Sequence, residues 1–310
     1  MSVSNPAKNQ SALPKDYLED GTLYKGGNGM LTWLAHRMSG VAIVYFLTLH
    51  IVEAIQLFGG PANYSEATAV YKQPWFRPFE WLLVMAVIYH ALNGLRVMLY
   101  DTWPRTTRYH RQIFWIGVGL FVLATPMVGY AMLKSVFGMS LQEIFASMNG
   151  LGYALAIVLP VALPVLYVAW RGSGLSNGPL IVSQSSSRPA PMKNNFERLS
   201  WQFMRISGVI LIVLVFWHLI IMHFINDISN ITGDFVFARF AENPTWIAVD
   251  LSMLVLAWLH GLNGVRIVIT DYMRRGYIRR VVLMALFAFG LVWLVAGAIV
   301  LFRLPNGLGA

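Results

Sequence analysis

Two heptapeptides decide the fold of this 310-residue chain: HALNGLR at residues 90–96 and HGLNGVR at residues 260–266. They lie 170 residues apart. An aspartate follows each of them in the same register, Asp101 in the first copy and Asp271 in the second. A shift that is shared over so many positions indicates an internal repeat.

A second repeated block marks the start of each copy. RMSGV at residues 37–41 recurs as RISGV at residues 205–209, a shift of 168, and His50 and His218 follow in the same register. The chain therefore contains two copies of one structural unit.

The composition excludes an ordinary soluble domain. The chain is 57% hydrophobic and 12% charged, with a mean hydropathy of +0.57, whereas soluble domains carry about 25% charged residues. An apolar run of about 20 residues crosses ~30 Å of hydrocarbon as a helix. Seven such runs occur, at residues 38–58, 79–100, 113–133, 152–170, 206–225, 246–270 and 281–302. We therefore predict an all-α membrane protein with seven transmembrane helices.

The repeat explains the odd number of spans. Three crossings leave the chain on the wrong side of the membrane to begin a second unit in the same orientation, and the span at 152–170 returns it. We expect two parallel three-helix repeats joined by this extra span. The predicted parts are an N-terminal segment at 1–30, a first unit at 31–133, a connecting loop and linking span at 134–170, a cytoplasmic linker at 171–200 and a second unit at 201–303.

The distribution of charge predicts the orientation. Of the 23 lysines and arginines, 18 fall in the segments on one side and five on the other. The positive-inside rule then places the N-terminus in the cytoplasm and the C-terminus outside, as a multi-pass protein of the cell (inner) membrane. The net charge of +9 indicates attraction to anionic membrane lipid and no nucleic-acid partner. The chain has no cysteine, which excludes disulfides, iron–sulfur ligation and thioether-bound haem.

Four histidines form two matched pairs. His50 and His218 each lie 13 residues beyond the repeated arginine, and His90 and His260 each lie six residues before another arginine. At 1.5 Å per residue these spacings correspond to about 20 Å and about 9 Å from the cytoplasmic end. Two imidazoles at one depth on related helices suit a haem, whose axial ligands approach opposite faces. We predict two haems, held by His90 with His260 and by His50 with His218.

Other repeated residues surround these pairs. Gly94 and Gly264 lie one turn after a histidine, where the lack of a side chain lets a porphyrin edge approach. The arginines near the cytoplasmic end could pair with haem propionates or could serve only as positive-inside residues; they are Arg37, Arg96, Arg205 and Arg266. His36 could contact a propionate or a quinone.

Two further ionisable residues lie toward the outer end. Glu53 is one turn beyond His50 and could relay protons or be a plain interfacial carboxylate. His223 is about 140° around the helix from His218 and is expected to pack at the interface.

These motifs resemble the cytochrome b membrane-anchor subunits of succinate dehydrogenase and fumarate reductase. The resemblance rests on HRMSG at residues 36–40, on the His-x-x-x-Gly motif of the second span, and on the closing pattern from Leu259 to Asp271 and Tyr272. The first half resembles the larger anchor and the second half the smaller, fused in one chain. Four histidine ligands make it similar to anchors that hold two b haems and typically use menaquinone.

The resemblance implies a role for each group. His90 and His260 would bind the haem nearest the iron–sulfur subunit, and His50 and His218 the distal haem. A quinone site at the cytoplasmic end would use Arg37, Ser39, Asp271 and Tyr272. Where the larger anchor has a serine four residues before the arginine, this chain has Trp33, so either Ser39 or Thr32 substitutes or the pocket differs. In the first copy of the repeat, Thr102 occupies the position that Tyr272 has in the second copy.

The implied function is that of an anchor. It would dock an iron–sulfur subunit, which carries a flavoprotein subunit, and pass electrons between them and a quinone. A higher oligomer of the complex is compatible with this role, and the chain itself would perform no dicarboxylate chemistry. Two alternatives remain open from the sequence: the di-haem cytochrome b subunit of another quinone-linked dehydrogenase, and a secondary transporter whose histidines bind protons or substrate.

Overall fold

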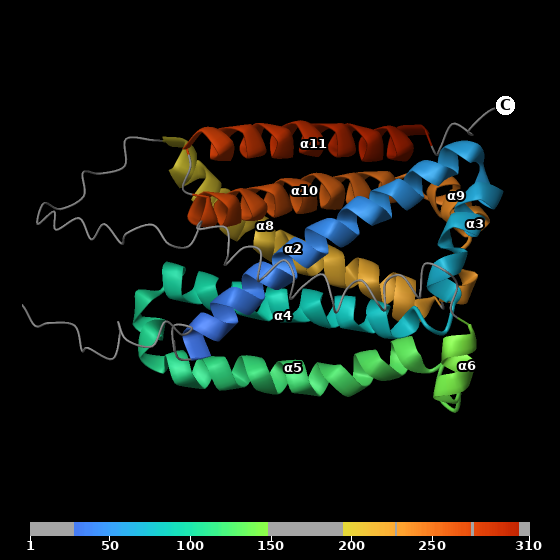
Figure 1. Cartoon of the computed structure of the whole chain (residues 1–310), viewed down its shortest axis with the longest axis horizontal. Coiled ribbons are helices and arrows are strands. Elements are labelled where there is room, and N and C mark those ends of the chain that lie inside the picture. The colour runs from blue at the N-terminus through green and yellow to red at the C-terminus, as the bar shows by residue number, and fades with distance from the viewer. Residues whose placement is uncertain (1–27, 148–194, 227, 274–275, 304–310) are drawn as a thin grey trace, which may run out of the picture.

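The computed structural model describes residues 28–147, 195–226, 228–273 and 276–303. Its regular elements within these ranges are all helical (Figure 1). The long helices are α2 (Asn28–Ile55), α4 (Arg77–Thr102), α5 (His110–Leu133), α8 (Asn195–Leu219), α10 (Thr245–Tyr272) and α11 (Gly276–Arg303). The α helices of ten residues or fewer are α3 (Pro61–Thr68), α6 (Leu141–Ala146) and α9 (Gly233–Glu242). Short 3₁₀ turns occur at Gln56–Gly59, Ala69–Lys72, Pro104–Tyr109 and Ile228–Asn230.

Six of the described helices are long and apolar enough to span a membrane. They run over Leu31–Gly59, Arg77–Thr102, Pro104–Leu133, Phe196–Ile225, Thr245–Tyr272 and Gly276–Arg303. These helices match six of the seven predicted spans. The remaining predicted span, at residues 152–170, lies outside the described residues. The protein is thus an integral, multi-pass helical membrane protein.

The first helix of each unit begins about ten residues before the apolar run that predicted it. Helix α2 starts at Asn28 and α8 at Asn195, whereas the corresponding runs begin at residues 38 and 206. The apolar run marks only the part of a helix that lies in hydrocarbon. Polar residues continue the backbone hydrogen bonding beyond the membrane, so hydropathy alone underestimates helix length.

The same order of elements occurs twice among the described helices. A long helix is followed by a short helix and then by two more long helices: α2, α3, α4, α5 and again α8, α9, α10, α11. In Figure 1, α2 and α8 begin at the same end of the bundle and run in the same direction. We call this end the Arg37 end, and the end that carries α3 and α9 the Glu53 end.

Four helices form the inside of the bundle. Helix α2 packs on α4, α10 and α11, and α8 packs on α10 and α4, while α5 lies on α4 and α11 on α10. Each of the four inner helices carries one of the predicted haem ligands: His50 on α2, His90 on α4, His218 on α8 and His260 on α10.

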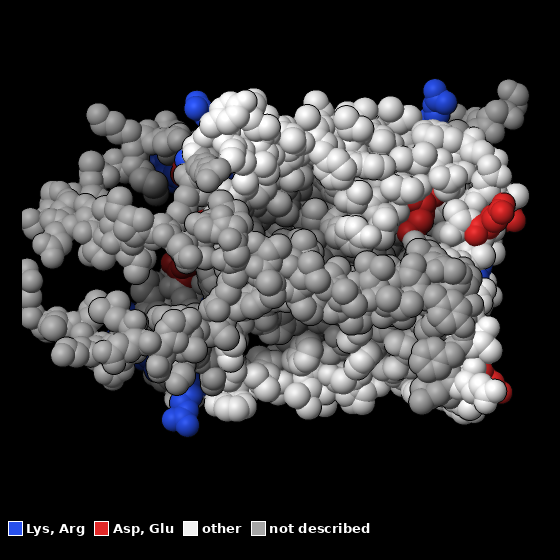
Figure 2. All heavy atoms as spheres, viewed as in Figure 1, with Lys and Arg blue, Asp and Glu red and all other residues white. Residues whose placement is uncertain are grey.

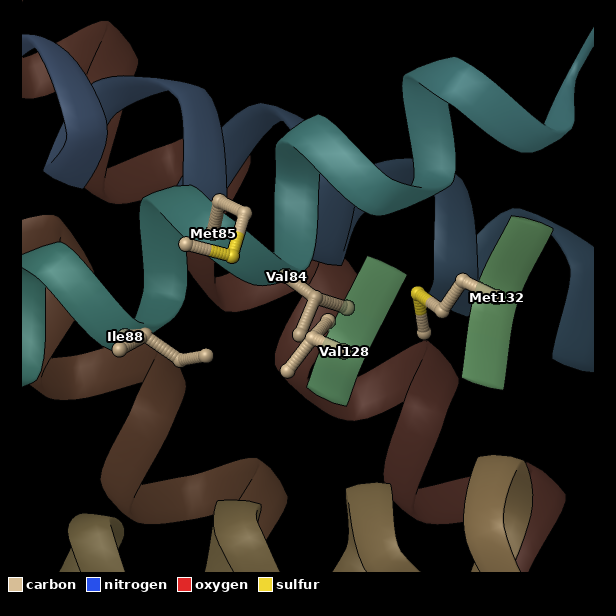
Figure 3. Packing of buried hydrophobic residues seen from close by; sticks show 5 residues of the cluster. All are labelled: Val84, Met85, Ile88, Val128 and Met132. Atoms are coloured by element: carbon tan, nitrogen blue, oxygen red, sulfur yellow. The ribbon is translucent and has the colours of Figure 1, made fainter. Parts of the chain in front are cut away.

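Apolar contacts hold the outer helices in place. Figure 3 shows Val84, Met85 and Ile88 of α4 against Val128 and Met132 of α5. Within hydrocarbon, helix association depends on close packing and interhelical hydrogen bonds more than on exclusion of water.

The α10–α11 contact uses both kinds of interaction. The indole Nε1 of Trp258 donates to the carbonyl of Gly290 at 2.6 Å. A Cβ at Gly290 would lie 2.3 Å from Leu262 Cδ1, so only glycine allows this approach without a shift of the leucine.

The surface agrees with a membrane location. On the face seen in Figure 2, the described charged side chains lie toward the two ends, and the described surface between them is uncharged. Large apolar side chains such as Leu123 (72% exposed) and Val213 (66%) point outward. Such exposure is unfavourable in water and is satisfied by lipid tails.

At the Glu53 end, α3 and α9 contact each other tightly. The backbone N–H of Gly233 donates to Ser65 Oγ at 3.0 Å. A Cβ at Gly233 would lie 2.2 Å from the carbonyl oxygen of Pro61. This backbone-to-backbone approach closes the end of the bundle and joins the two units.

Gly233→Ala is expected to destabilise the protein, because the new methyl group must push two backbones apart. Overpacking of this kind costs about 1–3 kcal/mol, which should lower the thermal unfolding midpoint of the detergent-solubilised protein by several degrees. Gly117→Ala is the matched control, since nothing lies within 4 Å of a Cβ built there. Equal midpoints for the two variants would contradict the assigned α3–α9 contact.

Candidate functional site

A cavity of about 510 Å³ lies between the four inner helices, within the range of ~300–1,000 Å³ that is usual for ligand sites. Its walls are mostly apolar. Four of its polar and glycine positions are matched between the two copies of the repeat: Arg37, Gly40, His90 and Gly94 from α2 and α4, and Arg205, Gly208, His260 and Gly264 from α8 and α10. His36 and Gly261 also line it.

His90 and His260 face each other across this cavity. Their ring centroids are 6.4 Å apart and their planes are inclined at 78°. If one metal ion bound a nitrogen of each ring at about 2 Å, the ring centres would be separated by roughly 6 Å. The spacing therefore would allow one metal ion to be held between the two rings, by one nitrogen of each.

A serine from the neighbouring helix positions each of these rings. Ser207 Oγ lies 2.9 Å from Nδ1 of His260, and Ser39 Oγ lies 3.2 Å from Nδ1 of His90. Each serine donates its single hydroxyl proton to a carbonyl one turn back, of Phe203 or His36.

The hydrogen-bond pattern determines the tautomer of both histidines. Because each serine proton is already donated, the serine oxygen can only accept, and Nδ1 must carry the hydrogen. For His90 the carbonyl of His36, 3.1 Å from Nδ1, requires the same. Nε2 of each ring is left with its lone pair, which is the state that binds a metal.

A glycine lies against each of these rings, and the contact is tight at Gly40 and ordinary at Gly208. A Cβ at Gly40 would lie 2.9 Å from Cε1 of His90, and one at Gly208 would lie 3.5 Å from Cε1 of His260. The predicted Gly94 lines the cavity, and a Cβ there would lie 3.6 Å from the ring of His36. At Gly264 a Cβ would meet nothing within 4 Å, so that position leaves open space in the cavity.

His36 lies parallel to His90, with ring centroids 4.0 Å apart and planes 7° apart. Its buried Nδ1 has no hydrogen-bond partner among the described residues. A buried donor or acceptor of this kind is costly unless a ligand satisfies it. The arrangement places His36 against the ring of His90, where the sequence had left its role open.

The second predicted pair is also brought together. The rings of His50 and His218 are 6.3 Å apart at 78°, nearly the same geometry as the first pair. Gly40 contacts His90, and His50 is ten residues farther along α2. His218 likewise follows Gly208 by ten residues, so the two pairs lie at levels about 15 Å apart.

Two reciprocal ion pairs join the units at the Arg37 end. Arg37 of α2 pairs with Asp271 of α10, and Arg205 of α8 pairs with Asp101 of α4. Each guanidinium also lies over an indole. Arg37 is 3.8 Å from the centre of the Trp33 ring.

Arg205 is 4.0 Å from the Trp201 ring. Trp33 and Trp201 are equivalent under the 168-residue shift, yet they were not predicted to act as a matched pair. Their spacing of four residues before each repeated arginine was the signal that could have revealed them.

The predicted quinone residues are only partly assembled. Tyr272 lies beside Arg37, whose guanidinium carbon is 5.8 Å from the ring centre, so Arg37, Asp271 and Tyr272 form one cluster. Ser39 does not join this cluster, because its hydroxyl is hydrogen-bonded to His36 and His90. Thr32 Oγ1 accepts from Arg96.

Arg96 and Arg266 do not line the cavity. Arg266 makes a bidentate pair with Glu197 at 2.8 and 3.0 Å, and Arg96 donates to Thr32, Asn93 and Tyr100. Both arginines thus tie helices together, and this geometry does not support the expectation that they pair with haem propionates.

His223 has a polar partner that the sequence did not reveal. Its Nδ1 lies 3.4 Å from Glu80, which also pairs with the buried Arg77 at 2.6 Å. His223 lies in a π-helical turn at Ile220–Ile225, which departs from the regular α-helical spacing that follows His218. Such a turn has no reliable sequence signal, so helical periodicity could not place this side chain.

The sequence profile of the succinate dehydrogenase/fumarate reductase transmembrane subunit family matches residues 13–126 and again residues 187–299. The chain belongs to this family. Each matched segment contains one copy of the repeat. Membership favours the anchor role over the other quinone-linked dehydrogenases and the transporter considered from the sequence.

Three similar proteins are named as membrane subunits of succinate dehydrogenase. The succinate dehydrogenase 2 membrane subunit SdhC of Mycobacterium tuberculosis is 44% identical over 108 residues, which cover 35% of this chain and 79% of that protein. The succinate dehydrogenase hydrophobic membrane anchor subunits of Archaeoglobus fulgidus and Thermoplasma acidophilum are 33% identical over 72 residues and 32% over 75. These alignments cover 23% and 24% of this chain and about three fifths, 62% and 61%, of the archaeal proteins.

Asp271→Asn should weaken the junction between the units, because it leaves the charge of Arg37 without its partner. Asp271 is 46% exposed, so solvent screening limits the loss to about 0.5–1 kcal/mol. Thermal unfolding of the solubilised protein should show a midpoint lower by a few degrees. Asp101→Asn is expected to behave alike, and exchange of the pair to Arg37→Asp with Asp271→Arg should recover part of the loss. An unchanged midpoint in both single variants would mean that the pairs do not hold the units together.

Proposed function

We propose that this chain is the haem b-containing membrane anchor of a succinate:quinone oxidoreductase. It would dock an iron–sulfur subunit, and through it a flavoprotein, and carry electrons between them and a quinone, with menaquinone favoured. The observation that carries the proposal is the presence of two histidine pairs with the same spacing, each shared between the two copies of the repeat.

The residues around the first pair suit a haem. Nε2 of His90 and of His260 would hold the haem iron, since Nδ1 of each is hydrogen-bonded to serine. Haem b, when bound, supplies one-electron transfer. The glycine-lined walls leave room for a flat ring between the four helices.

Two arginines are suited to hold the carboxylates of such a group. Arg37 and Arg205 both line the cavity. Nη1 of Arg37 and Nε of Arg205 are buried and have no hydrogen-bond partner within the described part of the chain. A propionate oxygen would satisfy each of them with a charge-assisted hydrogen bond. The indole beneath each guanidinium restricts its motion and keeps the donors aimed at the cavity.

The second pair supports a second haem about 15 Å away along the bundle. His50 and His218 repeat the spacing of the first pair, and their helices α2 and α8 are equivalent under the repeat. Because the two sites lie one above the other, electrons could cross most of the membrane thickness in steps between them. This arrangement matches the two-haem anchors that the sequence resembles.

The quinone is proposed to bind at the Arg37 end. Tyr272 can donate a hydrogen bond to a quinone carbonyl, and Arg37, steered by Asp271, can stabilise the negative charge that develops on the oxygen as electrons arrive. Trp33 covers the guanidinium of Arg37 and takes the position that a serine has in the larger anchors. The Arg37 end would face the cytoplasm and the iron–sulfur partner, in line with the charge asymmetry of the loops.

Two b haems per chain are expected in the purified complex. His260→Ala should remove the haem at the Arg37 end, and His50→Ala the haem at the Glu53 end, each leaving one haem bound. Pyridine haemochrome quantification and dithionite-reduced minus oxidised spectra measure this directly. A wild-type value of one haem that survives His50→Ala would remove the second site from the proposal.

Tyr272→Phe is expected to lower quinone turnover by about 10²-fold, because loss of one donor to a developing oxyanion costs ~2.7–4 kcal/mol of barrier. Both haems should remain bound, since Tyr272 lies 12 residues beyond His260. Succinate oxidation with an artificial acceptor that bypasses the anchor is the control and should be unchanged. Normal quinone turnover with unaltered inhibitor sensitivity would place the quinone elsewhere.

A further inference from the structure

Glu53 lies at the second histidine pair in a position that neither the repeat nor the family resemblance explains. Its side chain is only about 10% exposed, and Oε2 lies 3.5 Å from Nδ1 of His50. The hydroxyl of Tyr71 donates to its other oxygen, Oε1. The carboxylate is therefore held between a phenol from the Ala69–Lys72 turn and the ring of a proposed iron ligand.

The partners of Glu53 leave its negative charge uncompensated. Burial, together with the charge of Glu53, raises the pKa of the Tyr71 phenol above its ordinary value, so Tyr71 stays neutral and acts as a donor. Among the described residues, no lysine or arginine pairs with Glu53. The other nearby acid, Asp250, is neutralised by Arg239 through two bonds of 2.9 and 3.2 Å.

The other three ligands have no such partner. His90 and His260 each contact a neutral serine hydroxyl. Nδ1 of His218 is buried and without a hydrogen-bond partner in the part of the chain that the structure describes. The position equivalent to Glu53 in the second copy is Ile221. The acid is thus a feature of one ligand only.

We propose that Glu53 is a positioning residue that accepts the Nδ1 hydrogen of His50 and strengthens its Nε2 as a ligand to the haem at the Glu53 end. This inference rests on the proposed function. A carboxylate partner makes a metal-bound imidazole more basic. It also places a negative charge near the iron, and both effects favour the oxidised iron, which carries one more positive charge than the reduced iron.

Glu53 therefore holds the reduction potential of this haem below the value that a neutral partner would give. Tyr71 moderates the effect, because its hydrogen bond withdraws charge from the carboxylate. The haem between His90 and His260 is controlled separately, by Ser39 and Ser207. The repeat thereby provides two haem sites that differ in one contact. At one site a carboxylate, Glu53, contacts a histidine ligand, and at the other both histidines contact neutral serines.

The test is a potentiometric titration of the purified complex, followed by optical difference spectra. The signal of the haem at the Glu53 end is identified as the one lost in His50→Ala. Glu53→Gln preserves the size and an acceptor oxygen but removes the charge. It should raise the ratio of reduced to oxidised haem about tenfold at a fixed potential, a shift of about 59 mV for one electron. The other haem should not shift.

Two further variants separate this effect from a general disturbance. Glu66→Gln removes an exposed carboxylate of α3 at the same end and should leave both potentials unchanged. Tyr71→Phe keeps the charge of Glu53 and removes the donor, so it should lower the potential of the same haem. A shift opposite to that of Glu53→Gln is not expected from loosened packing.

An unchanged potential in Glu53→Gln, with both haems bound, would overturn the proposal. If Glu53→Gln loses the haem at the Glu53 end, Tyr71→Phe decides: a shift of that haem alone supports the proposal, and no shift overturns it. A wild-type complex without b-haem absorption would instead refute the proposed function itself, before any variant of Glu53 is compared.

Discussion

A buried imidazole in a membrane is costly when its Nδ1 hydrogen has no partner inside the protein, and the structure around His90 and His260 follows from this constraint. Hydrocarbon offers no hydrogen-bond partner, so an unsatisfied ring nitrogen would cost several kcal/mol. Ser39 and Ser207 meet the requirement for His90 and His260, each from the helix beside the histidine. At His90 the close approach of the ring requires the neighbouring Gly40, since a Cβ there would lie 2.9 Å from Cε1 of the ring.

The repeated Arg-x-Ser-Gly motif therefore has a function at each of its polar or small positions. The arginine faces the cavity and pairs with an aspartate of the other unit, the serine fixes the histidine tautomer, and the glycine lies against the ring, most closely at Gly40. Each aspartate lies 11 residues beyond a histidine on the same helix. Helices α4 and α10 therefore each supply an imidazole ring and the carboxylate that pairs with an arginine of the other unit. The two units are thus joined by reciprocal contacts at the same depth.

The sequence predicted the six spans that the structure describes, the two histidine levels and the Arg37–Asp271–Tyr272 cluster, because helical rise converts residue spacing directly into depth. It did not predict which of the other side chains at these depths line the cavity. Arg96 and Arg37 both lie near one end of their helices, yet only Arg37 lines the cavity, since the rotation of each helix depends on packing partners. Ser39 was likewise expected at the quinone from its depth alone, but the rotation of α2 turns its hydroxyl to His90. The π-helical turn that brings His223 to Glu80 follows no periodic pattern at all.

The central claim is that each haem iron is held by one histidine from each copy of the repeat. Low-temperature electron paramagnetic resonance of the oxidised complex tests it most directly, because the signal depends on both axial ligands and on the angle between their planes. Rings inclined at 78° in both pairs predict two highly anisotropic low-spin ferric signals. One of them should disappear when either member of a pair is replaced. A high-spin signal in the intact complex, or loss of both signals from one replacement, would contradict the assignment.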